Sequence, residues 1–152
     1  MAYSRVEPNY TVARPLRVVV WHAYGVTMTI HEWIHWQAAL GQYPDDVMGY
    51  DHFVDFREGT WAIENEEILG AMGFSERFFE NDPEDSIEKK LKSAVVCSGG
   101  PALAGWRNYV ELTNVSANPF QIRIFEELSG AISWLGHTDA DFQSHVPKLK
   151  FD

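Results

Sequence analysis

The stretch from Thr27 to Leu40, TMTIHEWIHWQAAL, constrains this chain most, because it contains the H-E-x-x-H pattern. On an α-helix, side chains four positions apart lie on the same face, so His31 and His35 are predicted to converge on one point. Zn²⁺ accepts such a pair of imidazoles, and the carboxylate of Glu32 can then act as general base on a metal-bound water. The alternative is an amphipathic helix in which both histidines are ordinary polar residues.

Length and composition favour one globular domain and limit the classes of partner. The chain has 152 residues, of which 45% are hydrophobic and 14% aromatic, enough to bury an ordinary core. Its net charge of −10 argues against binding to nucleic acid or to an anionic membrane surface, since both require a basic patch. We expect residues 1–15 to be an extended lead-in and residues 16–152 to form the single domain.

Cysteine content and apolar run length favour a cytoplasmic protein. Cys97 is the only cysteine, so neither an intrachain disulfide nor a thiolate zinc cluster is expected, and Cys97 is predicted to be a buried small hydrophobe. The first fifteen residues lack the apolar core of a signal peptide, and no apolar run is long enough to span a bilayer. The expected partner is a peptide or small-molecule substrate.

Local signals predict an α+β, mainly helical domain with a small β-sheet beside the HExxH helix. Partial alternation over Val47–Phe56 predicts a strand, and Leu16–Val20 predicts either a strand or the first turns of the metal helix. Cap, Gly and Pro signals predict the helices. They are Glu64–Met72 after Thr60, Ser86–Ser98 after Asp85, Pro101–Leu112, Asn118–Leu135, and a short one opened by Thr138 or Asp139 and ended by Pro147.

A catalytic zinc site needs a third protein ligand besides the two histidines. Glu58, Glu64 and Glu67 lie at a suitable distance along the chain, although Glu64 and Glu67 are also typical of a solvated acidic helix face. Asp139 and Asp141 are the other candidates, at a loop-to-helix junction near the C-terminus. One of these two aspartates could serve only as a helix cap. The spacing leaves these alternatives open.

The ordered set of motifs resembles the peptidase domain of FtsH-type zinc proteases and their small stand-alone relatives. The motifs are HEWIH at 31–35, the Gly-rich segment AVVCSGGPALA at 94–104, and GHTDADF at 136–142. The resemblance runs over most of residues 16–146, and it implies a zincin-like fold and a bound zinc ion.

By this resemblance, His31 and His35 would bind zinc and Glu32 would be the general base. An aspartate of the late helix would be the third ligand. Asp141 is preferred because an apolar residue follows it, as in the family, and Asp139 is the alternative.

The sequence gives weaker predictions for the roles of three further histidines. His137 could assist an oxyanion in the transition state if it borders the site, or it could be an exposed loop residue. His22 is out of phase with His31 on a continuous helix and is read as structural. His52, within the expected strand, could line the cleft, but a surface position is favoured.

We therefore expect a zinc-dependent hydrolase, foremost a metallopeptidase, in which Glu32 activates a zinc-bound water. The first alternative is a non-proteolytic binding or interaction module on the same scaffold. The second is a metalloenzyme that acts on a small molecule, because one fold hosts many reactions.

Overall fold

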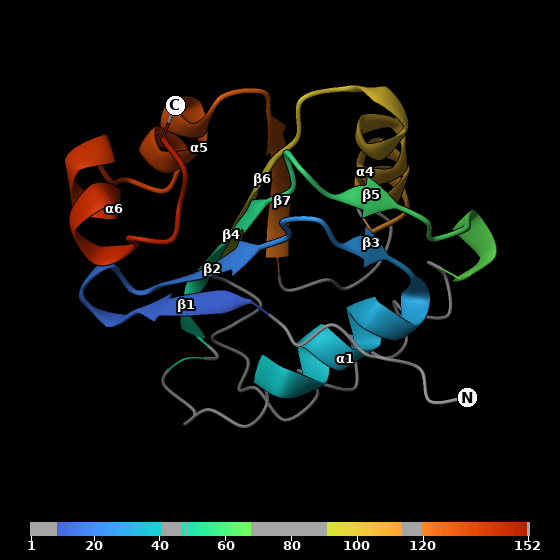
Figure 1. Ribbon diagram of the computed structural model, residues 1–152, viewed down its shortest axis with the longest axis horizontal. Coiled ribbons are helices and arrows are strands. Elements are labelled where there is room, and N and C mark those ends of the chain that lie inside the picture. The colour runs from blue at the N-terminus through green and yellow to red at the C-terminus, as the bar shows by residue number, and fades with distance from the viewer. Residues whose placement is uncertain (1–8, 41–46, 48, 68–90, 114–119, 152) are drawn as a thin grey trace.

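A computed structural model describes residues 9–40, 47, 49–67, 91–113 and 120–151 (Figure 1). Strands and helices alternate along most of this chain. In order, they are β1 (Tyr10–Ala13), the 3₁₀ turn η1 (Arg14–Leu16), β2 (Val18–His22), β3 (Thr27–Met28), α1 (Ile30–Leu40), β4 (Asp51–Asp55), β5 (Thr60–Trp61), β6 (Leu91–Val96), α4 (Gly100–Thr113), β7 (Phe120–Phe125), α5 (Leu128–Trp134) and α6 (Asp139–His145).

A five-stranded mixed sheet forms the centre of the molecule, with strand order β1-β2-β4-β6-β7. Strands β2, β4, β6 and β7 are parallel to one another, and β1 pairs antiparallel with β2. Helices α1 and α4 cover one face of this sheet, and α5 and α6 cover the other (Figure 1). The sheet therefore separates two helical layers.

The sequence of β2 explains why both faces are covered. All five residues of this VVVWH strand are buried. Successive side chains of a strand point to opposite faces, so Val19 and Trp21 pack on the α1 side while Val18 and Val20 pack on the α6 side. A strand buried on both faces is typical of a parallel sheet between helices.

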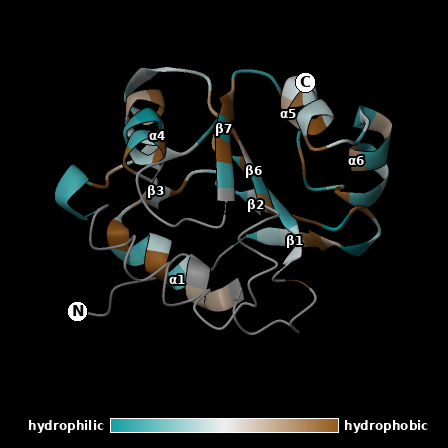
Figure 2. Ribbon diagram, turned by 180° about the vertical axis from the view of Figure 1, so that it is seen from behind, coloured by the Kyte–Doolittle hydropathy of each residue, from teal (hydrophilic) through white to brown (hydrophobic). Residues whose placement is uncertain are grey.

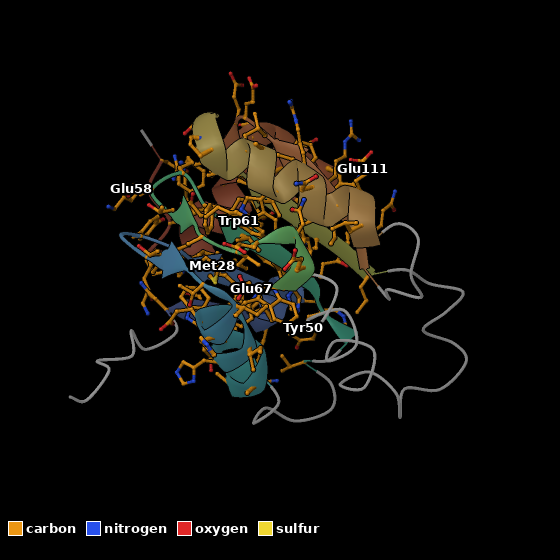
Figure 3. The ribbon with its side chains drawn as sticks, turned by 90° about the vertical axis from the view of Figure 1, so that its right-hand side faces the viewer. Met28, Tyr50, Glu58, Trp61, Glu67 and Glu111 are labelled. Carbon is orange, nitrogen blue, oxygen red and sulfur yellow. The ribbon has the colours of Figure 1, made fainter. Side chains whose placement is uncertain are left out.

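A small parallel sheet of β3 and β5 lies between α1 and α4 and brings aromatic side chains together (Figure 3). The indole of Trp61 packs against that of Trp106, with ring centroids 4.8 Å apart, and its Nε1 donates to the Ile63 carbonyl at 3.0 Å. Gly105 makes this contact possible, because a Cβ there would lie 2.1 Å from Trp61 Cδ1.

The expectation of a mainly helical chain with a small sheet is wrong, because the five-stranded sheet is the centre of the fold. Two expected helices contain strands. Within the predicted Ser86–Ser98 helix, residues 91–96 form β6; within the predicted Asn118–Leu135 helix, residues 120–125 form β7 before α5 begins. Short apolar runs fit a buried strand as well as a helix, and pairing of β6 with β4 and β7 decides between them.

Other expected elements are confirmed. Helix α4 matches the predicted Pro101–Leu112 helix, β4 lies within Val47–Phe56, and the strand alternative for Leu16–Val20 holds. Thr138 is the N-cap of α6, and Cys97 is buried.

Three expected segments differ in extent or lie partly outside the described residues. The HExxH helix begins at Ile30, since Thr27–Met28 form β3. Of the predicted Glu64–Met72 helix, 65–67 are helical and 68–72 lie outside the described residues. Within the expected lead-in, Tyr10–Ala13 form β1. None of the described helices is long and apolar enough to cross a membrane.

Gly105→Ala tests the packing of α4 on β5. Helix propensity favours alanine by about 0.5–1 kcal/mol, but the new methyl group must displace the Trp61 indole. We expect the cost of displacing the indole to exceed the gain in helix propensity. The free energy of unfolding measured by urea titration should therefore fall by roughly 2 kcal/mol. Gly130→Ala on α5 is the control, because its nearest neighbour is Phe125 Cδ1 at 3.4 Å. A stabilised Gly105→Ala protein would contradict this packing.

Candidate functional site

The HExxH motif begins at the second residue of α1, two residues after Thr29. The Thr29 hydroxyl accepts a hydrogen bond from the Glu32 backbone N–H at 3.2 Å, and the Thr29 carbonyl accepts from the Trp33 N–H at 2.9 Å. Thr-x-x-Glu is the spacing of a capping box, and a carboxylate in the first turn is favoured by the helix dipole. The start of the helix therefore gives a local reason for a glutamate at position 32.

Two indoles fix the rotation of α1 about its axis. Trp33 and Trp36 are buried, Trp36 stacks on Trp21 of β2 with centroids 5.6 Å apart, and Trp33 contacts Tyr109 of α4 at 6.4 Å. Because these bulky side chains take the sheet-facing side, His31 is exposed and His35 is half-buried. The two imidazoles of the motif thus lie in different environments.

One flank of α1 carries unsatisfied polar atoms. Within the described part of the chain, Glu32 Oε2, His35 Nε2 and Trp36 Nε1 are buried without a hydrogen-bond partner. At 3.6 residues per turn these three side chains fall within about 100° of arc, so they share one flank. Each such atom costs about 1–3 kcal/mol in the folded protein. A cluster of them marks a place where a ligand or partner gains by supplying the missing contacts.

The structure places the aspartates predicted as third ligand on α6, across the sheet from α1. Asp141 completes a capping box with Thr138: its Oδ2 accepts the Thr138 N–H at 3.1 Å, and its own N–H donates to Thr138 Oγ1 at 3.2 Å. These hydrogen bonds hold the pKa of Asp141 below its usual range, and the one from the Thr138 backbone contributes most. Asp139 Oδ2 accepts from the Ser129 hydroxyl at 2.7 Å. Both carboxylates therefore serve the local structure of α5 and α6.

The remaining predicted residues are His137, Glu64 and Glu67. His137 is half-buried beside Phe142, on the α6 side of the sheet. Glu64 is exposed, and Glu67 Oε1 accepts the Glu64 N–H at 3.0 Å (Figure 3).

The described residues show no assembled three-ligand zinc site of the kind that the motif predicts. In that part of the chain, no group of three or more His, Cys, Asp or Glu side chains is arranged to hold a metal ion. A structural or catalytic zinc site needs at least three protein ligands directed at one point. Of the predicted set, α1 directs only the His35 imidazole and the Glu32 carboxylate toward the protein.

Sequence reasoning did not detect a buried polar cluster at the carboxyl ends of β2 and β4. His22 and Asp55 are register partners on these strands, and both are fully buried. Asp55 accepts two hydrogen bonds from the Arg57 guanidinium at 2.8 Å each and one from the Tyr24 hydroxyl at 2.7 Å. Burial alone would raise the pKa of Asp55, but these donors hold it below its usual range. Parallel pairing of β2 and β4 is the signal that brings these residues together.

This cluster anchors the end of the described chain. Arg57 Nη2 donates to the Lys150 carbonyl at 2.6 Å, and the Lys150 N–H donates to the Tyr24 hydroxyl at 3.3 Å. Lys150 Nζ also pairs with Glu58 at 3.1 Å, and neighbouring Leu149 is buried. Both oxygens of Asp55 are already occupied, so the cluster stabilises the fold rather than presenting a reactive carboxylate.

His52 also differs from its expected place, since it is 5% exposed rather than on the surface. Trp21 Nε1 donates to its Nδ1 at 3.2 Å on the α1 side of the sheet. Side chains alternate along β4, so His52 lies on the same face as Val54. That face packs against the aromatic residues between the sheet and α1.

Comparison with protein-family models, with curated proteins and with solved structures finds no match to this chain.

The two buried histidines predict a loss of stability in mild acid. The pKa of both His22 and His52 is lowered to about 4, chiefly by burial, with a smaller contribution from Lys148 at His22. Below about pH 6.5 both histidines become protonated in the unfolded chain but stay neutral in the folded chain. The free energy of unfolding therefore falls as the pH drops from 6.5 toward 4. We expect each histidine to reduce the free energy of unfolding by about 2 kcal/mol between pH 7 and pH 5.

Urea unfolding at both pH values checks this expectation. His22→Gln and His52→Gln should each reduce the difference in stability between pH 7 and pH 5, whatever they do to stability at pH 7. The same pH dependence in the wild type and in both variants would contradict the assignment.

Proposed function

We propose that this chain is a binding or interaction module and that α1 is its binding element, without metal-dependent peptidase activity. The observation that carries the proposal is the flank of α1 formed by Glu32, His35 and Trp36, with its three buried, unsatisfied polar atoms. The position of the predicted aspartates supports it, because α6 lies across the sheet. A module of this kind needs complementary contacts, not a complete metal site.

The chemistry of this flank favours a cationic group on the partner. A carboxylate oxygen only accepts hydrogen bonds, so the buried Oε2 of Glu32 is best satisfied by a charged donor. The net charge of −10 attracts positively charged partners over longer distances. We therefore propose that the partner supplies an arginine or lysine side chain.

Zinc-dependent hydrolysis is the competing function, and one observation favours it. Glu32 Oε2 and His35 Nε2 are both buried and unsatisfied, and they are the general base and one zinc ligand of the predicted mechanism. If zinc binds, it lowers the pKa of a bound water and polarises the substrate carbonyl. His35 would hold the ion, and Glu32 would accept a proton.

Metal content and hydrolysis separate the two functions. We expect the purified protein to contain no stoichiometric zinc, to keep its thermal midpoint in the presence of a chelator, and to cleave no unstructured peptide. One zinc per chain, lost in His35→Gln but kept in His145→Gln on the exposed surface of α6, would contradict the proposal. Hydrolysis that disappears in Glu32→Gln would identify the peptidase instead.

Binding to a cationic peptide tests the proposed partner chemistry. Tryptophan fluorescence should report binding of an arginine-containing peptide, and Glu32→Gln should weaken it about tenfold, because a hydrogen bond to a charged group contributes about 1.5–3 kcal/mol. Glu111→Gln on α4 is the matched control, since Glu111 is exposed and its substitution changes the net charge equally. Equal weakening by both variants would show that only net charge matters and would contradict a site at Glu32.

A further inference from the structure

The outer edge of β7 has the features of a pairing surface. β7 is a terminal strand of the sheet, and among the described residues it pairs only with β6. Figure 2 shows it in the foreground, with α4 on one side and α5 on the other. The helices cover its faces, while its outer backbone edge is left without a paired strand in the described part of the chain.

Apart from the charge of Arg123, the sequence of β7 lacks the usual devices that prevent edge pairing. The strand FQIRIF is six residues long and contains no proline, glycine or lysine. Natural edge strands are commonly shortened, bent or given such residues, because unpaired N–H and C=O groups recruit other strands. The opposite edge strand, β1, has four residues and is followed by a 3₁₀ turn that contains Pro15. The two edges are thus protected to different degrees.

Side chains of β7 alternate between its two faces. Ile122 and Ile124 are half-buried and pack on the α4 side, whereas Gln121 and Arg123 are exposed. The guanidinium of Arg123 lies over the Phe125 ring, 5.2 Å from its centroid. Because Arg123 is the only charged residue of the strand, its position decides which pairing registers are acceptable.

We propose that β7 pairs with β7 of a second copy of this chain, antiparallel about a twofold axis, to form one continuous ten-stranded sheet. In a symmetric antiparallel pair, two residues opposite each other point to the same face of the sheet. Residues on the α4 side of one copy are therefore opposite residues on the α4 side of the other. A register centred on Arg123 opposes two like charges and is unfavourable. A register centred on Ile122 places Ile122 opposite its own equivalent, and Gln121 opposite Arg123 of the other copy.

This register makes the strand self-complementary. Isoleucines meet on the α4 side, where each copy already has an apolar layer. On the other face, the Gln121 carbonyl can accept a hydrogen bond from the guanidinium of Arg123 of the other copy, twice by symmetry. This interface does not include α1, so the dimer is expected whether or not that helix binds metal or a cationic peptide.

Charge substitutions at Gln121 test the dimer. Sedimentation equilibrium at physiological ionic strength, where the repulsion between two chains of charge −10 is screened, should show a monomer–dimer equilibrium. Gln121→Arg places two like-charged pairs across the interface and should raise the dissociation constant about tenfold. Gln121→Glu creates two opposite-charge pairs and should lower it severalfold.

The same two substitutions at Gln143, an exposed residue of α6, are the matched controls and should leave the dissociation constant unchanged. A wild-type chain that stays monomeric at all concentrations overturns the proposal. So do substitutions at Gln121 and Gln143 with equal effects, because the interface would then lie elsewhere. Neither result depends on zinc content or peptide binding.

Discussion

The rest of the structure depends on burial of the parallel strands from both sides. β2 is buried at every position, and the buried residues of β4 and β6 point to both faces of the sheet. Side chains of this kind leave water only when each face is covered, so helices must lie on both sides. The connection after β2 carries α1 to one face, and the segment after β7 carries α5 and α6 to the other. The separation of α1 from α6 follows from this requirement.

The parts of the fold that local sequence could predict are those with a single local explanation. Thr138 opens α6 because its hydroxyl and the Asp141 carboxylate satisfy each other's backbone N–H groups, a pattern readable within four residues. Gly99 and Gly100, both at positive φ, turn the chain from β6 into α4, and the Gly-Gly-Pro sequence indicates that helix start. β6 and β7 could not be predicted in this way. Their apolar runs fit a helix or a strand, and long-range pairing with neighbouring strands decides the outcome.

The candidate site shows the same limit. Spacing of four residues places His31 and His35 on one side of a helix, but it does not say which side faces the sheet. Burial of Trp33 and Trp36 decides that, and it turns His31 to solvent. Likewise, no local signal assigns Asp141 to one face of a sheet whose strand order is unknown. The His22 and Asp55 pair became recognisable only when β2 and β4 were known to be parallel neighbours.

The distance between residues 35 and 141 tests most directly the claim that the sheet separates the HExxH helix from the aspartates. Spin labels attached to His35→Cys and Asp141→Cys can be measured by pulsed electron paramagnetic resonance, because the native Cys97 is buried. Two layer spacings of about 10 Å each predict a separation of roughly 20 Å or more. Side chains that share a zinc ion through bonds of about 2 Å would instead keep the labels within roughly 15 Å. We expect the longer distance; the shorter one would show that α1 and α6 do not lie on opposite faces of the sheet.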